Sequence, residues 1–136
     1  QLDWGLRGGP PRFLQKPRIA RLATIRTDGY PHIVPVYSMR DGDDIILGSD
    51  RDERKVRNAA ANPKGALVIG GDPAMDEAGY MFQGDLSIEE DARHAVTRRM
   101  VHRYENKEEA QQHAAEWTDS DIVLIRLRPK SVIRVY

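Results

Sequence analysis

The feature that most constrains the fold is a series of short alternating segments joined by turns rich in Asp and Gly. Residues 18–26 alternate between two faces, as a half-buried strand does. The turn Thr27-Asp28-Gly29 follows, in which glycine can adopt a positive φ angle, and residues 30–39 form the partner strand. A second turn, Asp41-Gly42-Asp43, leads to a third strand over residues 44–49. The pattern predicts a meander of three antiparallel strands.

Proline indicates where the second of these strands lies in the sheet. Pro31 and Pro35 have no N–H group and cannot donate a hydrogen bond to a neighbouring strand. We therefore expect this strand at an edge of the sheet, or irregular at these two positions.

The rest of the chain adds helices and further strands. The composition predicts a helix over residues 52–61 that Asp50 or Asp52 caps and Asn62-Pro63 ends. We expect two more helices, at residues 89–104 and 107–117, and four more strands, at residues 65–69, 80–88, 122–127 and 131–136. No alternating βαβ units are present, which disfavours a doubly wound parallel sheet. The prediction is a mainly β (α+β) fold, a closed or partly closed antiparallel barrel of six to seven strands with peripheral helices.

The start of the chain differs from the rest in composition. Glycine and proline interrupt any regular pattern in residues 1–17, which predicts an extended or briefly helical N-terminal arm. Trp4, Phe13 and Leu14 are the side chains that would anchor this arm on the body. The domain itself is expected over residues 18–136.

Composition excludes several classes of function. Lysine plus arginine and aspartate plus glutamate both number 21, so the formal net charge is zero, which disfavours a nucleic-acid partner. The chain has no cysteine, which excludes disulfides, thiolate catalysis and Cys-type metal sites. No apolar run is long enough to span a bilayer, and the N-terminus has no signal-like apolar core. We expect no membrane partner and a cytoplasmic location.

The segment from Ser49 to Lys55 is the strongest candidate for a binding site. It joins a strand to a helix, so a hydroxyl group lies beside free backbone N–H groups at the positive end of the helix dipole. Arg54 and Lys55 add two positive charges in the first turn, and these are the elements of a phosphate site. A solvated, charge-mixed helix start remains the alternative, because acidic residues nearly balance the basic ones here.

Other polar residues give weaker signals. The segment 21–26 offers polar groups either to a flat aromatic ligand or to solvent, and solvent is the simpler interpretation. His32, His94, His102 and His113 lack the spacing of a metal site, and we expect them to be surface or partly packed residues. Glu89-Glu90-Asp91 is interpreted as a set of acids at a helix start. The aromatic residues expected in the core or at an interface are Trp4, Tyr80, Tyr104, Trp117 and Tyr136.

Several of these pieces together, in order, resemble a known family. The run from Leu22 to Val36 has a Leu-Ala-Thr strand, an Asp-Gly turn, Pro31-His32 and an apolar strand with proline. Further along follow Asp41-Gly42-Asp43, Ser49, Lys55, Asn58 and Asn62-Pro63. This order resembles the pyridoxamine 5′-phosphate oxidase-like family over roughly residues 18–136, most strongly over 19–69.

The resemblance implies a split β-barrel homodimer that binds FMN, or the deazaflavin coenzyme F420, in two clefts at the dimer interface. It implies that Ala23, Thr24, Ile25 and Arg26 line the flavin and that Pro35 and Val36 lie beside its ring. Ser49 and Lys55 would hold the phosphate, with Arg54 and Asn58 nearby. Gln83 and Gly84 would approach the ring from the partner chain.

The chain also departs from the oxidase that gives the family its name. It is short, and it lacks an Arg-x-Val-Leu-Leu-Lys phosphate segment and the C-terminal substrate-binding arginine segment. We therefore expect an FMN-binding oxidoreductase that transfers a hydride through flavin N5 to or from a small-molecule substrate, with no catalytic side chain and no metal. The alternatives are a reductase that uses F420, a non-enzymatic binder of flavin or haem, for which His32 is the histidine of interest, and an interaction module with an empty cleft.

Overall fold

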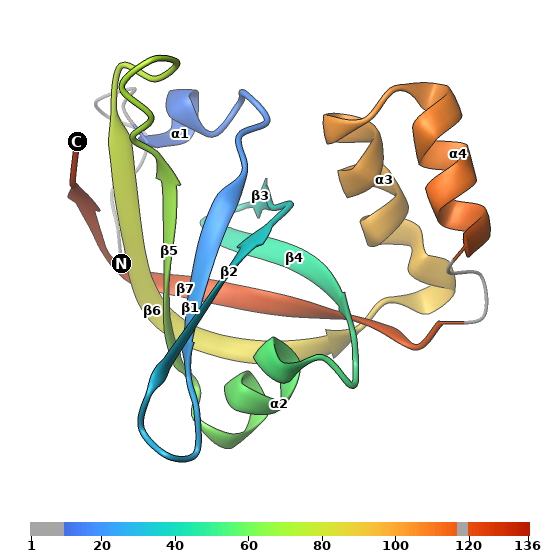
Figure 1. The fold of residues 1–136 in the computed structure, drawn as a ribbon, viewed down its shortest axis with the longest axis horizontal. Helices are drawn as coiled ribbons and strands as arrows, with labels where there is room; N and C mark the ends of the chain where they lie inside the picture. Colours follow the sequence, from blue (N-terminus) through green and yellow to red (C-terminus); the bar gives the residue numbers. More distant parts are fainter. Residues whose placement is uncertain (1–9, 117–119) are drawn as a thin grey trace.

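The computed structural model describes residues 10–116 and 120–136, which form one antiparallel sheet with helices around it (Figure 1). The strands of this sheet are β1 (Ala20–Ile25), β2 (Pro31–Val36), β3 (Met39–Asp41), β4 (Asp44–Asp50), β5 (Lys64–Gly70), β6 (Gly79–Glu90) and β7 (Ile122–Arg134). The helices are α1 (Pro10–Phe13), α2 (Arg54–Ala61), the 3-10 turn η1 (Ala92–His94), α3 (Ala95–Tyr104) and α4 (Lys107–Glu116).

The sheet curls into an open barrel. Its strand order is β2-β1-β5-β6-β7-β4-β3, and every neighbouring pair is antiparallel. The two edge strands, β2 and β3, are joined only by Tyr37 and Ser38, so this short link holds the two edges close together at that point. The predicted antiparallel barrel with seven strands and peripheral helices is therefore confirmed, and β2 is an edge strand as its prolines indicated.

The predicted meander is confirmed only in its two turns. β1 pairs with β2 across the first turn, and β3 pairs with β4 across Asp41-Gly42-Asp43. The single second strand predicted over residues 30–39 is wrong, because it is divided into β2 and β3, which stand at opposite ends of the sheet order. Alternation within a segment predicts a strand but does not name all of its partners. The other partner of β4 is β7, from the far end of the chain.

The two closing strands predicted around Arg128-Pro129-Lys130 are one strand, β7. The ladder between β6 and β7 passes through this region with a β-bulge: Gln83 is opposite Ser131 and Gly84 is opposite Pro129, so Lys130 has no partner in the register. A Cβ atom on Gly84 would collide with the Arg128 carbonyl oxygen, so only glycine fits here. The bulge accommodates the proline that the sequence suggested as a turn.

The helix predicted over residues 89–104 starts later than expected. Glu89 and Glu90 belong to β6 and pair with β7, and α3 begins at Ala95. Asp91 does act as the acid at the helix start: Oδ1 accepts from Val96 N–H at 3.0 Å and Oδ2 from Thr97 N–H at 2.9 Å. The expected cap of α2 by Asp50 or Asp52 is also wrong, because the N-cap is Glu53 and it makes no side-chain capping bond.

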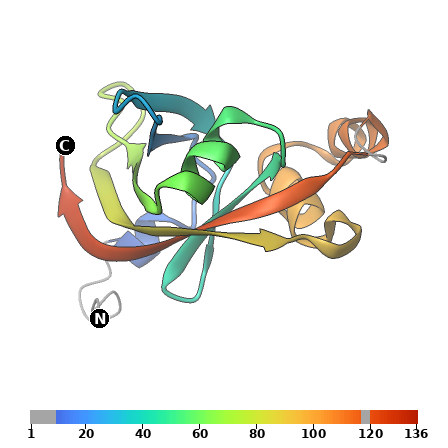
Figure 2. The same ribbon diagram turned by 90° about the horizontal axis from the view of Figure 1, so that it is seen from below.

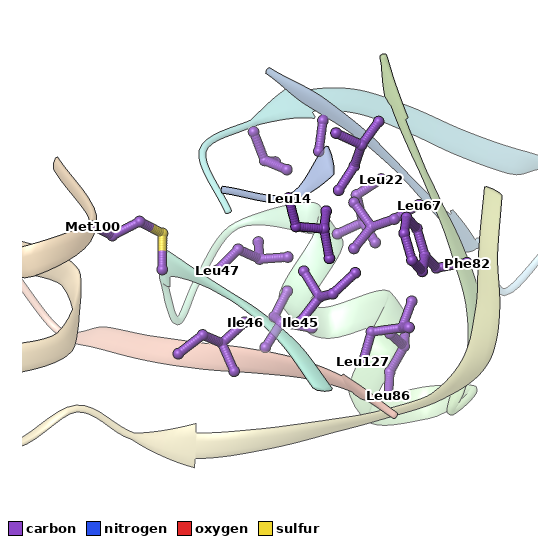
Figure 3. Close-up of a cluster of buried hydrophobic side chains, with 14 of the residues drawn as sticks. Leu14, Leu22, Ile45, Ile46, Leu47, Leu67, Phe82, Leu86, Met100 and Leu127 are labelled. Carbon is purple, nitrogen blue, oxygen red and sulfur yellow. The ribbon is translucent and has the colours of Figure 1, made fainter. Parts of the chain in front are cut away.

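The barrel interior is apolar and closely packed (Figure 3). Five strands supply large side chains with no measurable exposure, which are Leu22, Leu47, Leu67, Phe82, Val123, Ile125 and Leu127. Leu14 and Met100 join this cluster from outside the sheet. Phe13 is buried as well and meets Tyr80 edge-on, with ring centroids 5.2 Å apart. Trp4 and Trp117 lie outside the described residues.

The helices occupy two separate places. α2 lies across one end of the barrel, whereas α3 and α4 form a hairpin beside β4 (Figures 1 and 2). No helix in the described part of the chain combines the length and the apolarity that a membrane-spanning helix needs.

Candidate functional site

A pocket of about 260 Å³ lies where the end of β2, the end of β4, the start of α2 and the α3–α4 hairpin meet. Backbone and side chains from six elements or their junctions line it, which are Pro35, Val36, Tyr37, Gly48, Ser49, Asp50, Glu53, Lys55, Thr97, Met100, Val101, His113 and Ile122. Two stretches of the chain, residues 35–55 and 97–122, therefore converge on one place.

One wall of the pocket carries anion-binding groups. The Ser49 side chain is largely buried, and its hydroxyl donates to the Asp50 carbonyl oxygen at 3.1 Å. The Lys55 side chain is only 15% exposed, with its amine 3.9 Å from a Glu53 carboxylate oxygen. α2 begins beside both, and no side chain caps its N-terminus. This wall combines a hydroxyl, an ammonium group and the positive end of a helix dipole.

An ion-pair network fixes the loop that leads into α2. The Arg51 guanidinium lies 2.7 Å from the Asp121 carboxylate and 2.5 Å from that of Glu90, so it ties the loop to the ends of β6 and β7. The hydrogen bond from Arg51 holds the pKa of the Asp121 carboxyl below its ordinary value. The network orients the start of α2, where the anion-binding groups lie.

A second wall of the pocket, which includes Tyr37 and His113, carries a different chemistry, and Glu105 contacts both residues. The Tyr37 hydroxyl donates to Glu105 Oε2 at 2.7 Å, and His113 Nδ1 lies 3.2 Å from the same oxygen. The hydrogen bond to Glu105, together with desolvation, raises the pKa of Tyr37 to about 12. The Tyr37 ring stacks on Tyr104 with centroids 4.2 Å apart.

The structure brings four of the predicted cofactor-binding residues into this pocket: Pro35, Val36, Ser49 and Lys55. Thr24 and Asn58 are instead buried together, where Asn58 Nδ2 donates to Thr24 Oγ1 at 3.0 Å. This pair connects α2 to β1 inside the molecule and does not line the pocket.

The remaining predicted residues lie elsewhere in the chain. Arg54 faces a neighbouring groove that Asp50, Arg57 and Asp121 also line. Ala23 and Ile25 are half-buried on β1, and Arg26 pairs with Asp28 at 3.0 Å in the hairpin. Gln83 and Gly84 mark the bulge in β6, and Gln83 accepts a hydrogen bond from Ser131 at 3.4 Å.

The sequence analysis missed the pocket wall with Tyr37 and His113, and the Glu105 carboxylate that contacts both. His113 was expected to be a surface or partly packed residue, and its side chain is indeed 45% exposed, yet it also lines the pocket. Tyr37 and Glu105 are 68 residues apart in the sequence, so no local spacing could have signalled their hydrogen bond.

Comparison with known proteins identifies the family. The family model described as pyridoxamine 5′-phosphate oxidase matches residues 11–136, nearly the whole chain. The chain belongs to the pyridoxamine 5′-phosphate oxidase family. No curated protein matches the sequence at a significant level.

Solved structures agree with this family assignment. An F420 reductase is 25% identical, with a TM-score of 0.73 and coverage of 92% of this chain and 96% of that chain. A conserved hypothetical protein from Mycobacterium tuberculosis is also 25% identical, with a TM-score of 0.75 and coverage of 94% and 82%. The haem storage protein HutZ from Vibrio cholerae, at 18% identity and a TM-score of 0.72 over 94% and 93%, shares the fold. Members with this fold therefore carry different functions.

The donor set of the pocket fits a flavin-type phosphate. Ser49, Lys55 and the uncapped start of α2 supply the hydroxyl, positive charge and N–H groups that phosphate binding requires. Pro35 and Val36 add a non-polar surface next to them. The pocket of about 260 Å³ is slightly smaller than the usual range of ligand sites, about 300–1,000 Å³.

Proposed function

We propose that the protein is an oxidoreductase that binds FMN at this pocket and acts on a small-molecule substrate. The observation that carries the proposal is the convergence of Ser49, Lys55 and the start of α2 beside Pro35 and Val36. When bound, the cofactor supplies hydride transfer through its N5 position. The chain's own residues bind and orient it: Lys55 and Ser49 hold the phosphate, and Pro35 and Val36 support the ring.

The deazaflavin coenzyme F420 is the second candidate for the cofactor. One specific observation favours it, the similarity to an F420 reductase over nearly the full length of both chains. Both coenzymes carry a phosphate next to a ribityl-linked tricyclic ring, so the same pocket suits either.

A homodimer is part of the proposal. The pocket of one chain is slightly smaller than a usual ligand site, which supports a second copy that would complete it. Ile33 on edge strand β2 and Tyr30 just before it are both largely exposed, and they form an apolar edge that a second copy could cover. Sedimentation equilibrium of the chain tests this: we expect a dimer, and an Ile33→Asp variant should shift the population towards monomer. A wild-type chain that stays monomeric at high concentration would contradict it.

The experiment that tests the cofactor is the visible absorption spectrum of the protein, alone and after mixing with FMN or F420 and desalting. A retained two-band flavin spectrum supports FMN, and a retained single-band deazaflavin spectrum supports the second candidate. Haem is the third ligand to mix with the protein in the same way. His32 is the histidine of interest for haem, because its Nδ1 is buried without a hydrogen-bond partner among the described residues. Retention of haem alone, or of none of the three, would overturn the proposed redox function.

A further inference from the structure

Glu105 contacts two residues of the pocket wall, Tyr37 and His113, and this is the geometry of an oriented histidine. Three separate segments supply these residues: the two-residue link between β2 and β3, the residue after α3, and α4. The Glu105 carboxylate lies between the other two, with Oε2 2.7 Å from the Tyr37 hydroxyl and 3.2 Å from His113 Nδ1. Tyr37 and His113 both line the pocket.

The carboxylate is held in place from several directions. Its side chain is only 14% exposed, and the Tyr37 ring that binds it is stacked on Tyr104 at an interplanar angle of 7°. The Tyr104 hydroxyl is itself fixed, because it lies 2.7 Å from the Arg18 carbonyl oxygen and accepts from Ser38 N–H at 3.1 Å. Glu105 therefore presents its oxygens to His113 from a rigid support.

This contact determines which nitrogen of His113 exchanges a proton. An ionised carboxylate can only accept hydrogen bonds, so the imidazole donates Nδ1–H to Glu105. Nε2 is then the nitrogen that gains and loses a proton. The His113 side chain is 45% exposed, so it can exchange protons with water.

Other titratable or charged groups line this pocket or lie on the two helices of the hairpin. They are Tyr37, Asp50, Glu53, Lys55, Arg98, His102, Tyr104, Glu105 and Glu109. Glu105 is within hydrogen-bond distance of the His113 ring, at Nδ1.

We propose that His113 is the proton donor of this pocket, with Glu105 as its positioning residue. The inference rests on the proposed function. When bound, a reduced flavin-type cofactor would supply the hydride for reduction of a polarised double bond, and the π-electron pair would move to the atom that the hydride does not reach. That atom takes the proton from His113 Nε2, and the neutral imidazole regains a proton from water. Two electrons and two hydrogens enter the substrate, and the double bond becomes a single bond.

The first experiment needs no cofactor. Nitrogen-15 and carbon-13 NMR of the imidazoles in the ligand-free protein should show His113 in the Nδ1–H tautomer when neutral. Glu105→Gln replaces an acceptor-only carboxylate with an amide that can also donate, so the population of the Nδ1–H tautomer should fall. An Nε2–H tautomer in the wild type, or a tautomer population that is unchanged in Glu105→Gln, would overturn the positioning role.

The second experiment follows oxidation of the pre-reduced cofactor on the protein by a panel of cyclic enones, quinones and nitroaromatics. His113→Gln should slow it about a hundredfold at neutral pH and flatten the dependence of the rate on pH, while the dissociation constant of the cofactor stays within about twofold. His102→Gln, an exposed histidine on α3, is the matched control and should match wild type.

The outcomes separate the two proposals. If the cofactor binds and reacts but His113→Gln keeps the wild-type rate and pH profile, the proton-donor role is wrong and the proposed function stands. If neither FMN nor F420 binds, or no acceptor in the panel oxidises the bound cofactor faster than the free one, the proposed function fails and the proton-donor role fails with it.

Discussion

The two walls of the pocket are attached to the barrel in different ways. α2 is held by its interior face, where Val56, Asn58 and Ala59 are buried and Asn58 binds Thr24 on β1. In the hairpin, α3 buries Thr97, Met100 and Val101, but α4 buries only Ala110 among its described residues. The link from the hairpin to β2 is instead polar, through Tyr37, Glu105 and Tyr104 at the part-buried junction.

The difference separates two requirements of a cofactor site. Phosphate binding needs donors that are already in place, and burial of α2 fixes the helix start that carries them. Proton exchange needs access to water, and a wall held by partly exposed polar bonds provides it. Changes in the barrel and α2 should therefore alter stability or cofactor affinity, whereas changes in the hairpin wall should alter pH dependence.

The largest effect is expected in the barrel interior. Phe82 has no exposed surface. Phe82→Ala should therefore lower the free energy of unfolding by about 3–5 kcal/mol. Gln111→Ala, at an exposed position on α4, is the control and should leave the free energy of unfolding nearly unchanged. Urea denaturation measures both, and equal losses for the two variants would mean that the barrel is not the more tightly packed region.

The attachment of α2 gives the next largest effect. Asn58→Ala removes the amide that donates to Thr24 and leaves a buried hydroxyl without that partner. This change should cost about 1–3 kcal/mol of unfolding free energy. In a double-mutant cycle with Thr24→Val, the two losses should add to more than the loss of the double variant. Strict additivity would show that this hydrogen bond does not hold α2 in place.

The anion-binding wall is tested through affinity rather than stability. Lys55→Ala should weaken FMN or F420 binding about tenfold, equivalent to about 1.4 kcal/mol. The unfolding free energy should stay close to that of wild type, because the ion pair of Lys55 with Glu53 is long, at 3.9 Å. Arg57→Ala removes the same charge from an exposed position on α2 and is the matched control. Fluorescence titration measures the dissociation constants, and equal weakening by both variants would indicate a general charge effect rather than a specific contact.

The smallest effect is expected at the hairpin wall. Tyr37→Phe removes the hydrogen bond to Glu105. This loss should cost about 1 kcal/mol at neutral pH. Folding raises the pKa of Tyr37 from 10.0 to about 12, so its contribution is fully present below pH 10 and is lost as the pH rises through about 12. The difference in unfolding free energy between wild type and Tyr37→Phe should therefore shrink over that range, and a constant difference throughout it would contradict the assigned hydrogen bond.

Much of the fold could be predicted because its signals are local. The Asp-Gly turn between β1 and β2, the edge position of β2 and the end of α2 at Asn62-Pro63 each depend on the backbone chemistry of a few adjacent residues. The errors came where a local signal was overruled by a distant partner. Pro129 is typical of a turn, but the bulge opposite Gly84 lets β7 continue through it.

The sequence by itself determined the strand-rich barrel, the family and four of the residues that meet in the pocket, because period-two alternation, turn residues and an ordered set of motifs are written in neighbouring positions. Only the tertiary structure decided that β4 pairs with β7, that Thr24 and Asn58 face each other inside the molecule, and that Glu105 meets both Tyr37 and His113. These contacts depend on the curvature of the sheet and on the position of the α3–α4 hairpin. Burial and packing across the whole chain determine that curvature and that position, and no short stretch of sequence contains them.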